Sequence, residues 1–71
     1  MRDSFGTRLR RARMKARYSR PEVEIELGLE PGYLGKLECE IVLTTMDIVK
    51  RLAALYQVDL NWLCMMGEKD E

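Results

Sequence analysis

A chain of 71 residues with 46% hydrophobic and 34% charged side chains is expected to fold as one domain, not as a disordered or collagen-like segment. It has no histidine, and Cys39 and Cys64 have no partner at the spacing of a zinc site or a redox motif. No apolar run approaches the ~20 residues that cross a bilayer, and the amino terminus is too rich in arginine for a secretory signal. We therefore expect residues 1–71 to form a small cytoplasmic binding module without metal, cofactor or catalytic site.

The net charge of zero conceals an uneven distribution of charge along the chain. Residues 1–20 hold eight basic side chains and one acidic one, a net charge of +7, whereas residues 21–40 hold six glutamates and one lysine, a net charge of −5. Residues 41–71 add five acidic and three basic side chains, a net charge of −2. A cationic segment can attract a polyanion although the whole molecule is neutral. Alternatively the two blocks attract each other within the fold, and the sequence leaves both interpretations open.

The predicted elements are short helices separated by turn signals. Along residues 5–16, apolar side chains recur every three or four positions, which predicts an amphipathic helix with arginines on its other faces. Ser19 and Glu22 form a capping-box sequence around Pro21, which predicts the start of a second helix. Residues 22–27 alternate charged and apolar side chains as a half-buried strand does. We predict a helix there, because the chain has no second clear strand pattern and an isolated strand leaves its backbone groups unpaired.

A third helix is predicted after a turn at Gly28, which is placed to end the second helix in a left-handed conformation. The third helix is expected to begin with Pro31 at its first position and Glu30 as an imperfect cap. Gly32 and Gly35 then fall inside it, each at a cost of roughly 1 kcal/mol relative to alanine. This helix must therefore be held by its neighbours.

Two further helices complete the predicted all-α fold. Thr44 or Thr45 can cap a fourth helix with a wide apolar face, and Asp59 can cap a short fifth helix that Gly67 closes. The predicted domain then consists of a core and a charged tail, residues 5–66 and 67–71.

The pair of helices joined at Gly28 is the informative feature of the chain. A short helix, a tight turn and a second helix form the geometry with which a helix-turn-helix places its second helix in the DNA major groove. The residues that match a known pattern are Arg8-Leu9-Arg10, Arg13, Tyr18-Ser19, Glu22-Val23, Leu27-Gly28-Leu29, Tyr33-Leu34, Lys36-Leu37-Glu38, Leu52-Ala53, Val58 and Asp59-Leu60-Asn61-Trp62-Leu63. With these residues the chain resembles the lambda-repressor-like helix-turn-helix domains, the group that includes phage Cro proteins and xenobiotic-response-element-type regulators.

The resemblance implies a five-helix lambda-repressor-like DNA-binding domain and assigns roles to single residues. Arg13 and Glu38 match an arginine and a glutamate that pair between the first and third helices and fix the orientation of the third. The positions that the resemblance assigns to DNA contact are Arg20 at the start of the second helix, Pro31, Gly32, Tyr33 and Lys36 on the third, and Thr44 and Thr45 in the following loop.

Three positions depart from the pattern of the family. Glu24 replaces a small residue that packs under the turn, so its carboxylate must reach solvent or an arginine. Arg17 stands where the family often has a glycine with positive φ, which strains a residue that bears a side chain. Glu40 replaces another common turn glycine.

Few side chains of the predicted interface can read DNA bases. Pro31 and Gly32 offer no side-chain hydrogen bonds, which leaves Lys36, the Tyr33 hydroxyl and Arg20 for base recognition. The simpler alternatives are a solvated lysine, a tyrosine stacked on the fold and an arginine paired along its own helix.

The resemblance also implies a homodimer, since members of the family often pair through their carboxyl-terminal helices. The candidate contacts are Leu60, Trp62, Met65 and Met66, whose simpler role is in the core or at the chain end.

We therefore predict a sequence-specific transcriptional regulator of bacterial or phage type, for instance a repressor, that binds double-stranded DNA as a homodimer and is not an enzyme. The helix starting at Pro31 is expected to enter the major groove. The alternative is a helix-turn-helix scaffold that binds a protein partner, because the acidic, glycine-containing third-helix region suits a basic protein better than DNA. A basic first helix also suggests a membrane surface, but the glutamates of residues 22–40, folded close by, argue against that interpretation.

Overall fold

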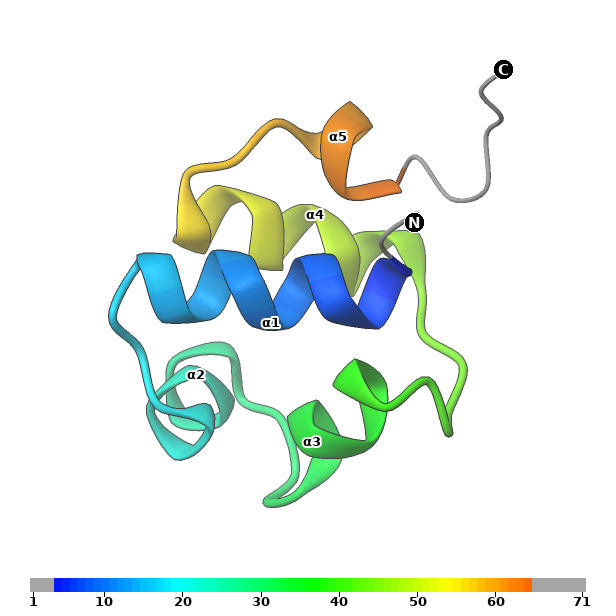
Figure 1. Cartoon of the computed structure of the whole chain (residues 1–71). Helices are drawn as coiled ribbons and strands as arrows, with labels where there is room; N and C mark the ends of the chain where they lie inside the picture. Colours follow the sequence, from blue (N-terminus) through cyan, green and yellow to red (C-terminus); the bar gives the residue numbers. More distant parts are fainter. Residues whose placement is uncertain (1–3, 65–71) are drawn as a thin grey trace.

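The computed structural model describes residues 4–64, and within that range the chain is entirely helical, without a β-strand (Figure 1). The helices are α1 (Phe5–Lys15), α2 (Arg20–Leu27), α3 (Tyr33–Glu38), α4 (Met46–Tyr56) and α5 (Leu60–Cys64). The prediction of five helices is confirmed, and so is the helical interpretation of residues 22–27.

Local sequence signals account for most helix ends. Ser19 and Glu22 form a complete capping box at the start of α2, and Gly28 ends it in the left-handed conformation with a φ of 69°. The Thr45 side chain accepts a hydrogen bond from the Ile48 amide and caps α4. A carboxylate oxygen of Asp59 accepts from the Trp62 amide, 3.2 Å away, at the start of α5. These predicted caps are all present, with Thr45 rather than its neighbour as the cap of α4.

The core lies between α1 and the other helices. Figure 1 shows α1 across the middle of the molecule, with α4 and α5 on one side and α2 and α3 on the other. Every helix contributes at least one fully buried aliphatic side chain, and burial of each is worth about 1.5–3 kcal/mol. These side chains are Leu9, Val23, Leu34, Leu37, Leu52 and Leu63.

The start of α3 differs from the sequence prediction. Pro31 and Gly32 lie in the turn before the helix, which begins at Tyr33, and Gly32 has a φ of 89°. Gly32 has no side chain to cap the helix. The Glu24 carboxylate serves instead, since one of its oxygens lies 3.0 Å from the amide nitrogens of both Gly32 and Leu34. The expectation that Glu24 reaches solvent or an arginine is therefore wrong, and its residue is only 6% exposed.

The other end of α3 is held against the start of α1. A Cβ atom on Gly6 would overlap the backbone carbonyl of Glu38, so the close approach of the two helices requires glycine there. The Glu40 carboxylate accepts a hydrogen bond of 2.9 Å from the Gly6 amide, although Glu40 has a φ of 59°. Carboxylates from outside the helix thus stabilise both ends of α3.

No helix among residues 4–64 combines the length and the hydropathy needed to span a membrane. The predicted roles of Met65, Met66, Gly67 and the tail of residues 67–71 lie outside the described residues.

Candidate nucleic-acid interface

Arg13 and Glu38 form the centre of the junction between α1, α2 and α3. Arg13 Nε lies 2.8 Å from Glu38 Oε2, and the side chains of Arg13 and Glu38 are only 10% and 3% exposed. A second nitrogen of Arg13 donates to the carbonyl of Tyr18, 2.9 Å away in the turn between α1 and α2. The structure therefore brings together the two residues that the resemblance pairs, and the pair connects all three segments.

Arg20 joins the same carboxylate from α2. Its Nε lies 3.2 Å from Glu38 Oε1, and half of its side chain is exposed. The alternative that Arg20 pairs with Glu24 is not realised, because Glu24 caps α3. Glu38 thus holds one buried and one half-exposed guanidinium, and the outer part of Arg20 faces solvent.

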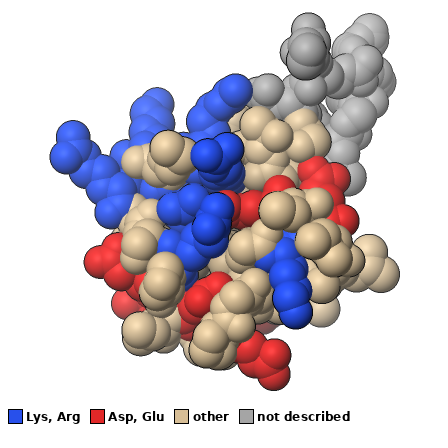
Figure 2. Space-filling model, turned by 60° about the horizontal axis from the view of Figure 1, so that its bottom comes forward, with Lys and Arg blue, Asp and Glu red and all other residues tan. Residues whose placement is uncertain are grey.

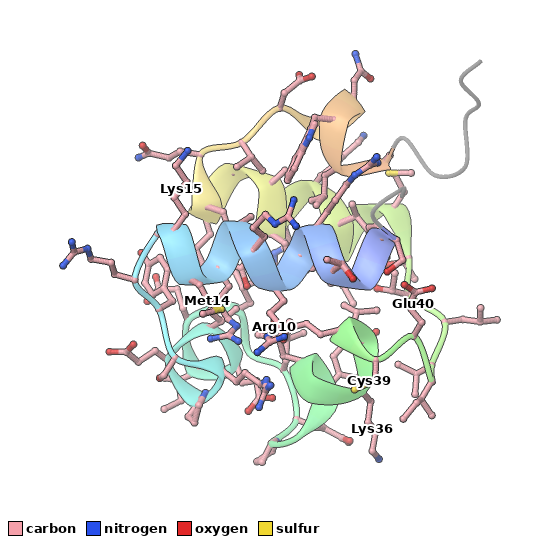
Figure 3. The ribbon with its side chains drawn as sticks, viewed as in Figure 1. Arg10, Met14, Lys15, Lys36, Cys39 and Glu40 are labelled. Atoms are coloured by element: carbon pink, nitrogen blue, oxygen red, sulfur yellow. The ribbon has the colours of Figure 1, made fainter. Side chains whose placement is uncertain are left out.

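The predicted contacts of α3 differ in how accessible they are. Lys36 is exposed, makes no hydrogen bond or ion pair with residues 4–64, and points away from the body of the molecule (Figure 3). Tyr33 is partly buried, and its hydroxyl donates a long hydrogen bond of 3.4 Å to the carbonyl of Leu43. Pro31 and Gly32 are exposed in the turn before the helix. Lys36 is therefore the side chain of α3 best placed to reach a ligand.

Thr44 and Thr45 do not present equivalent hydroxyls. Thr45 is exposed and uses its oxygen to cap α4. The Thr44 oxygen is buried and has no hydrogen-bond partner. A phosphate in this loop could reach Thr45, whereas the Thr44 hydroxyl is turned inward.

Exposed apolar side chains gather in the loop after α3. Ile41, Leu43 and Met46 are 72%, 96% and 54% exposed. They adjoin a hollow of about 420 Å³ in which Phe5, Leu37, Val42, Val49 and Cys64 form part of the wall. The unpartnered Thr44 hydroxyl belongs to a residue of the same wall.

The candidate dimer residues of α5 are less exposed. Leu60 and Trp62 are partly buried against the core, and the Arg8 guanidinium lies 5.7 Å from the centre of the Trp62 ring. Arg8 also donates to the Trp62 carbonyl at 3.1 Å. On the described part of α5, these side chains stabilise the fold rather than form an open apolar face.

Most glutamates of the acidic segment, residues 21–40, are already bound within the protein. Besides Glu24 and Glu38, Glu22 accepts from the Ser19 amide at 2.8 Å and Glu40 accepts from the Gly6 amide. The hydrogen bond from the Ser19 amide lowers the pKa of Glu22, and the Gly6 amide, with a smaller effect from the Ser4 hydroxyl, lowers the pKa of Glu40. The remaining two, Glu26 and Glu30, are exposed and have no bonded partner among residues 4–64.

The basic residues of α1 divide into paired and unpaired groups. Arg13 is bound to Glu38, whereas Arg10, Lys15 and Arg17 are exposed and make no hydrogen bond or ion pair within the described chain. Figure 2 shows Lys and Arg gathered on one side of the face seen there, reaching toward its middle, with acidic groups mainly beyond them. Mutual attraction of the two charge blocks therefore accounts for only part of the basic segment.

Three of these structural roles were missed in the sequence. Glu24, Gly6 and Glu40 act on partners between 8 and 34 residues away in the chain. A glycine near the start of a predicted helix is the only local signal at Gly6, and neither glutamate carries one.

The comparison of this sequence with protein-family models gives no match, and the comparison with curated proteins gives none either. Within residues 4–64, histidine, cysteine, aspartate and glutamate form no group of three that could hold a metal ion.

Proposed function

We propose that the chain is a DNA-binding transcriptional regulator in which α2 and α3 form a helix-turn-helix of the lambda-repressor-like type. The observation that carries the proposal is the way α3 is mounted. Glu24 holds its start and Glu38 ties its end to Arg13 and Arg20, while Lys36 on its outer surface is left without a partner in residues 4–64. A helix held rigidly by buried contacts, with its cation outward, suits insertion into the major groove.

Arg20 and Lys36 have different roles in this proposal. The exposed half of Arg20 contacts a backbone phosphate and sets the register of the protein on the duplex. Lys36 donates to the O6 and N7 acceptors of a guanine, the commonest specific contact of a basic side chain. Pro31 and Gly32 bring no bulky side chain to the turn before α3, so the backbone can approach the bases closely.

The acidic segment is compatible with DNA because its carboxylates are mostly occupied. Glu22, Glu24 and Glu40 accept hydrogen bonds from backbone amides, and Glu38 is paired with two arginines. An anion bonded to donors of its own repels a phosphate less than a free one does.

A homodimer on a two-fold-symmetric site is part of the proposal. Two copies would place their α3 helices about 34 Å apart, one turn of DNA. The exposed Ile41, Leu43 and Met46 supply the apolar surface that a second copy would cover, and the adjoining hollow gives this surface both a projection and a recess. A surface with both is self-complementary, as a two-fold interface requires. Leu60 and Trp62 would then lie behind the interface rather than in it.

The test is a selection of duplexes from a random pool, followed by titration of the selected duplex at several salt concentrations and a molar-mass measurement. We expect salt-dependent binding by a dimer, and Lys36→Gln is expected to reduce discrimination against a changed base by 1–3 kcal/mol. Lys50→Gln, which removes an exposed lysine from α4, is the matched control and should bind as the parent does. Absence of duplex binding at 50 mM salt by folded protein would refute the proposal.

One observation favours the second candidate function, a protein-binding module. Ile25 is 82% exposed on α2, an unusual place for a large aliphatic side chain. Lys36→Glu separates the two functions, since charge reversal on α3 should abolish DNA binding and leave association with a protein partner through Ile25 intact. The reciprocal variant, Ile25→Ser, should weaken only the protein complex.

A further inference from the structure

Arg10 and Arg17, which we name the outer arginines, are cations that the fold does not use. Both are exposed, and neither makes a hydrogen bond or ion pair with any described residue. Arg13 and Arg20, by contrast, are bound to Glu38. The outer arginines therefore do not stabilise the fold through charge pairing.

The position of Arg10 relates it to the junction described above. Arg10 and Arg13 are three residues apart on α1, so they lie on one face of the helix. Figure 3 shows Arg10 on the side of α1 that faces α2 and α3, whereas Lys15 points to the opposite side. Arg10 thus lies on the same side as the shared carboxylate of Glu38, and that side of the molecule carries more guanidinium than carboxylate.

Arg17 adjoins the junction from the turn between α1 and α2. It lies three residues before Arg20, the first residue of α2, and the carbonyl of its neighbour Tyr18 accepts a hydrogen bond from Arg13. Its φ of 66° is in the left-handed region that glycine adopts most readily. A strained backbone position filled by an arginine without an internal partner is typical of a side chain that serves a ligand.

We propose that the outer arginines contact DNA phosphates beside the groove that α3 enters, so that α1 and its following turn extend the interface; this inference rests on the proposed function. The charges complement a polyanion, and they lie next to the half-exposed Arg20. Contacts of this kind are independent of base sequence. They therefore raise the affinity for every duplex by the same factor and leave discrimination between sequences unchanged.

The experiment compares the parent protein with Arg10→Gln/Arg17→Gln and with the control Lys15→Gln/Lys50→Gln. The control also removes two exposed cations, one from the opposite side of α1 and one from α4. Each protein is titrated with the selected duplex and with a scrambled duplex of equal length between 50 and 200 mM KCl. Circular dichroism verifies that all three are folded.

We expect the outer-arginine variant to lower the slope of log K against log salt by about 1.8, at ~0.9 per phosphate contact. Its affinity for both duplexes should fall by the same factor, roughly 5- to 10-fold per contact at 0.1 M salt. The control should retain the slope of the parent. The inference is overturned if the parent binds duplex but the outer-arginine variant and the control have the same slope.

The outcomes also separate this inference from the proposed function. A parent that binds no duplex removes both. A changed slope in the outer-arginine variant, with no loss of discrimination in Lys36→Gln, supports the phosphate contacts and removes the role of α3. As a second variant, Arg17→Gly relieves the left-handed strain, so its melting temperature should rise while its affinity for duplex falls. A variant that is more stable and binds as tightly as the parent overturns the role of Arg17.

Discussion

Glu24 on α2 accepts a hydrogen bond from the backbone amide of Leu34 in the first turn of α3, at 3.0 Å and out of contact with water. The same oxygen accepts from Gly32, so a side chain from a different helix supplies the cap that α3 lacks. A helix of six residues is too short to be stable alone. The orientation of α3 therefore depends on Glu24 as much as on its buried leucines.

Replacement of Glu24 is expected to destabilise the fold. In Glu24→Ala the amides of Gly32 and Leu34 lose their acceptor, at a cost of about 3 kcal/mol in the free energy of unfolding. Glu24→Gln keeps one acceptor oxygen and should cost about 1 kcal/mol. Urea denaturation measures both variants, and hydrogen exchange of the two amides locates the effect. Equal stability of the alanine variant and the parent would show that the cap is dispensable.

Two glycines should respond to alanine in opposite directions. Gly6→Ala would force α1 away from the Glu38 carbonyl, with an expected loss of about 2–3 kcal/mol. Gly35→Ala should gain about 0.5–1 kcal/mol, because alanine suits the α3 helix better and its Cβ would meet only Arg20 Cδ, at 3.7 Å. Thermal denaturation of the pair is the measurement. A stable Gly6→Ala protein would mean that α1 and α3 need not approach so closely.

Removal of the Tyr56 hydroxyl is expected to stabilise the protein. The hydroxyl is buried without a hydrogen-bond partner, and burial, with a smaller effect from the Glu38 charge, raises the pKa of Tyr56 above its ordinary value. Tyr56→Phe keeps the ring, whose centre lies 6.3 Å from that of Tyr18, and removes the unpaired group. We expect a gain of about 1 kcal/mol in urea denaturation. A loss of stability would reveal that the hydroxyl is bonded in solution.

Acid should weaken the fold partly through Glu40. Its pKa is lowered in the folded state by the Gly6 amide, so its contribution to stability is complete above the ordinary value of 4.5 and is lost as pH falls through the folded pKa. Glu40→Gln should therefore lose less stability than the parent between pH 6 and pH 2, measured as melting temperature. Glu30→Gln, which removes an exposed carboxylate without a bonded partner in residues 4–64, should follow the parent. Parallel curves for the parent and Glu40→Gln would contradict this assignment.

Helix ends that depend on neighbouring residues could be predicted from the sequence. The capping box of Ser19 and Glu22 and the left-handed Gly28 involve only residues within one or two turns. The start of α3 could not, because Pro31 suggests a helix start from local preference alone and the true cap, Glu24, is seven residues earlier on another helix. Distant contacts of this kind appear only after the chain has folded.

The candidate site was predictable in part for the same reason. The pairing of Arg13 with Glu38 came from resemblance and not from spacing, and the sharing of Glu38 with Arg20 had no local signal. The exposure of Lys36 follows from its place on an amphipathic helix. Thr44 differs from Thr45 because the cap of α4 can use only one of the two neighbours, and the other turns its hydroxyl into the fold.

The separation of free cations on α1 from free carboxylates at Glu26 and Glu30 gives this neutral molecule an electric dipole. A dipole experiences a torque in the field of a charged rod, even where the net force on the molecule is small. A protein approaching a polyanion would therefore rotate the α1 side forward before the surfaces touch. Rotation in advance of collision enlarges the fraction of encounters that are productive, and added salt would abolish that advantage.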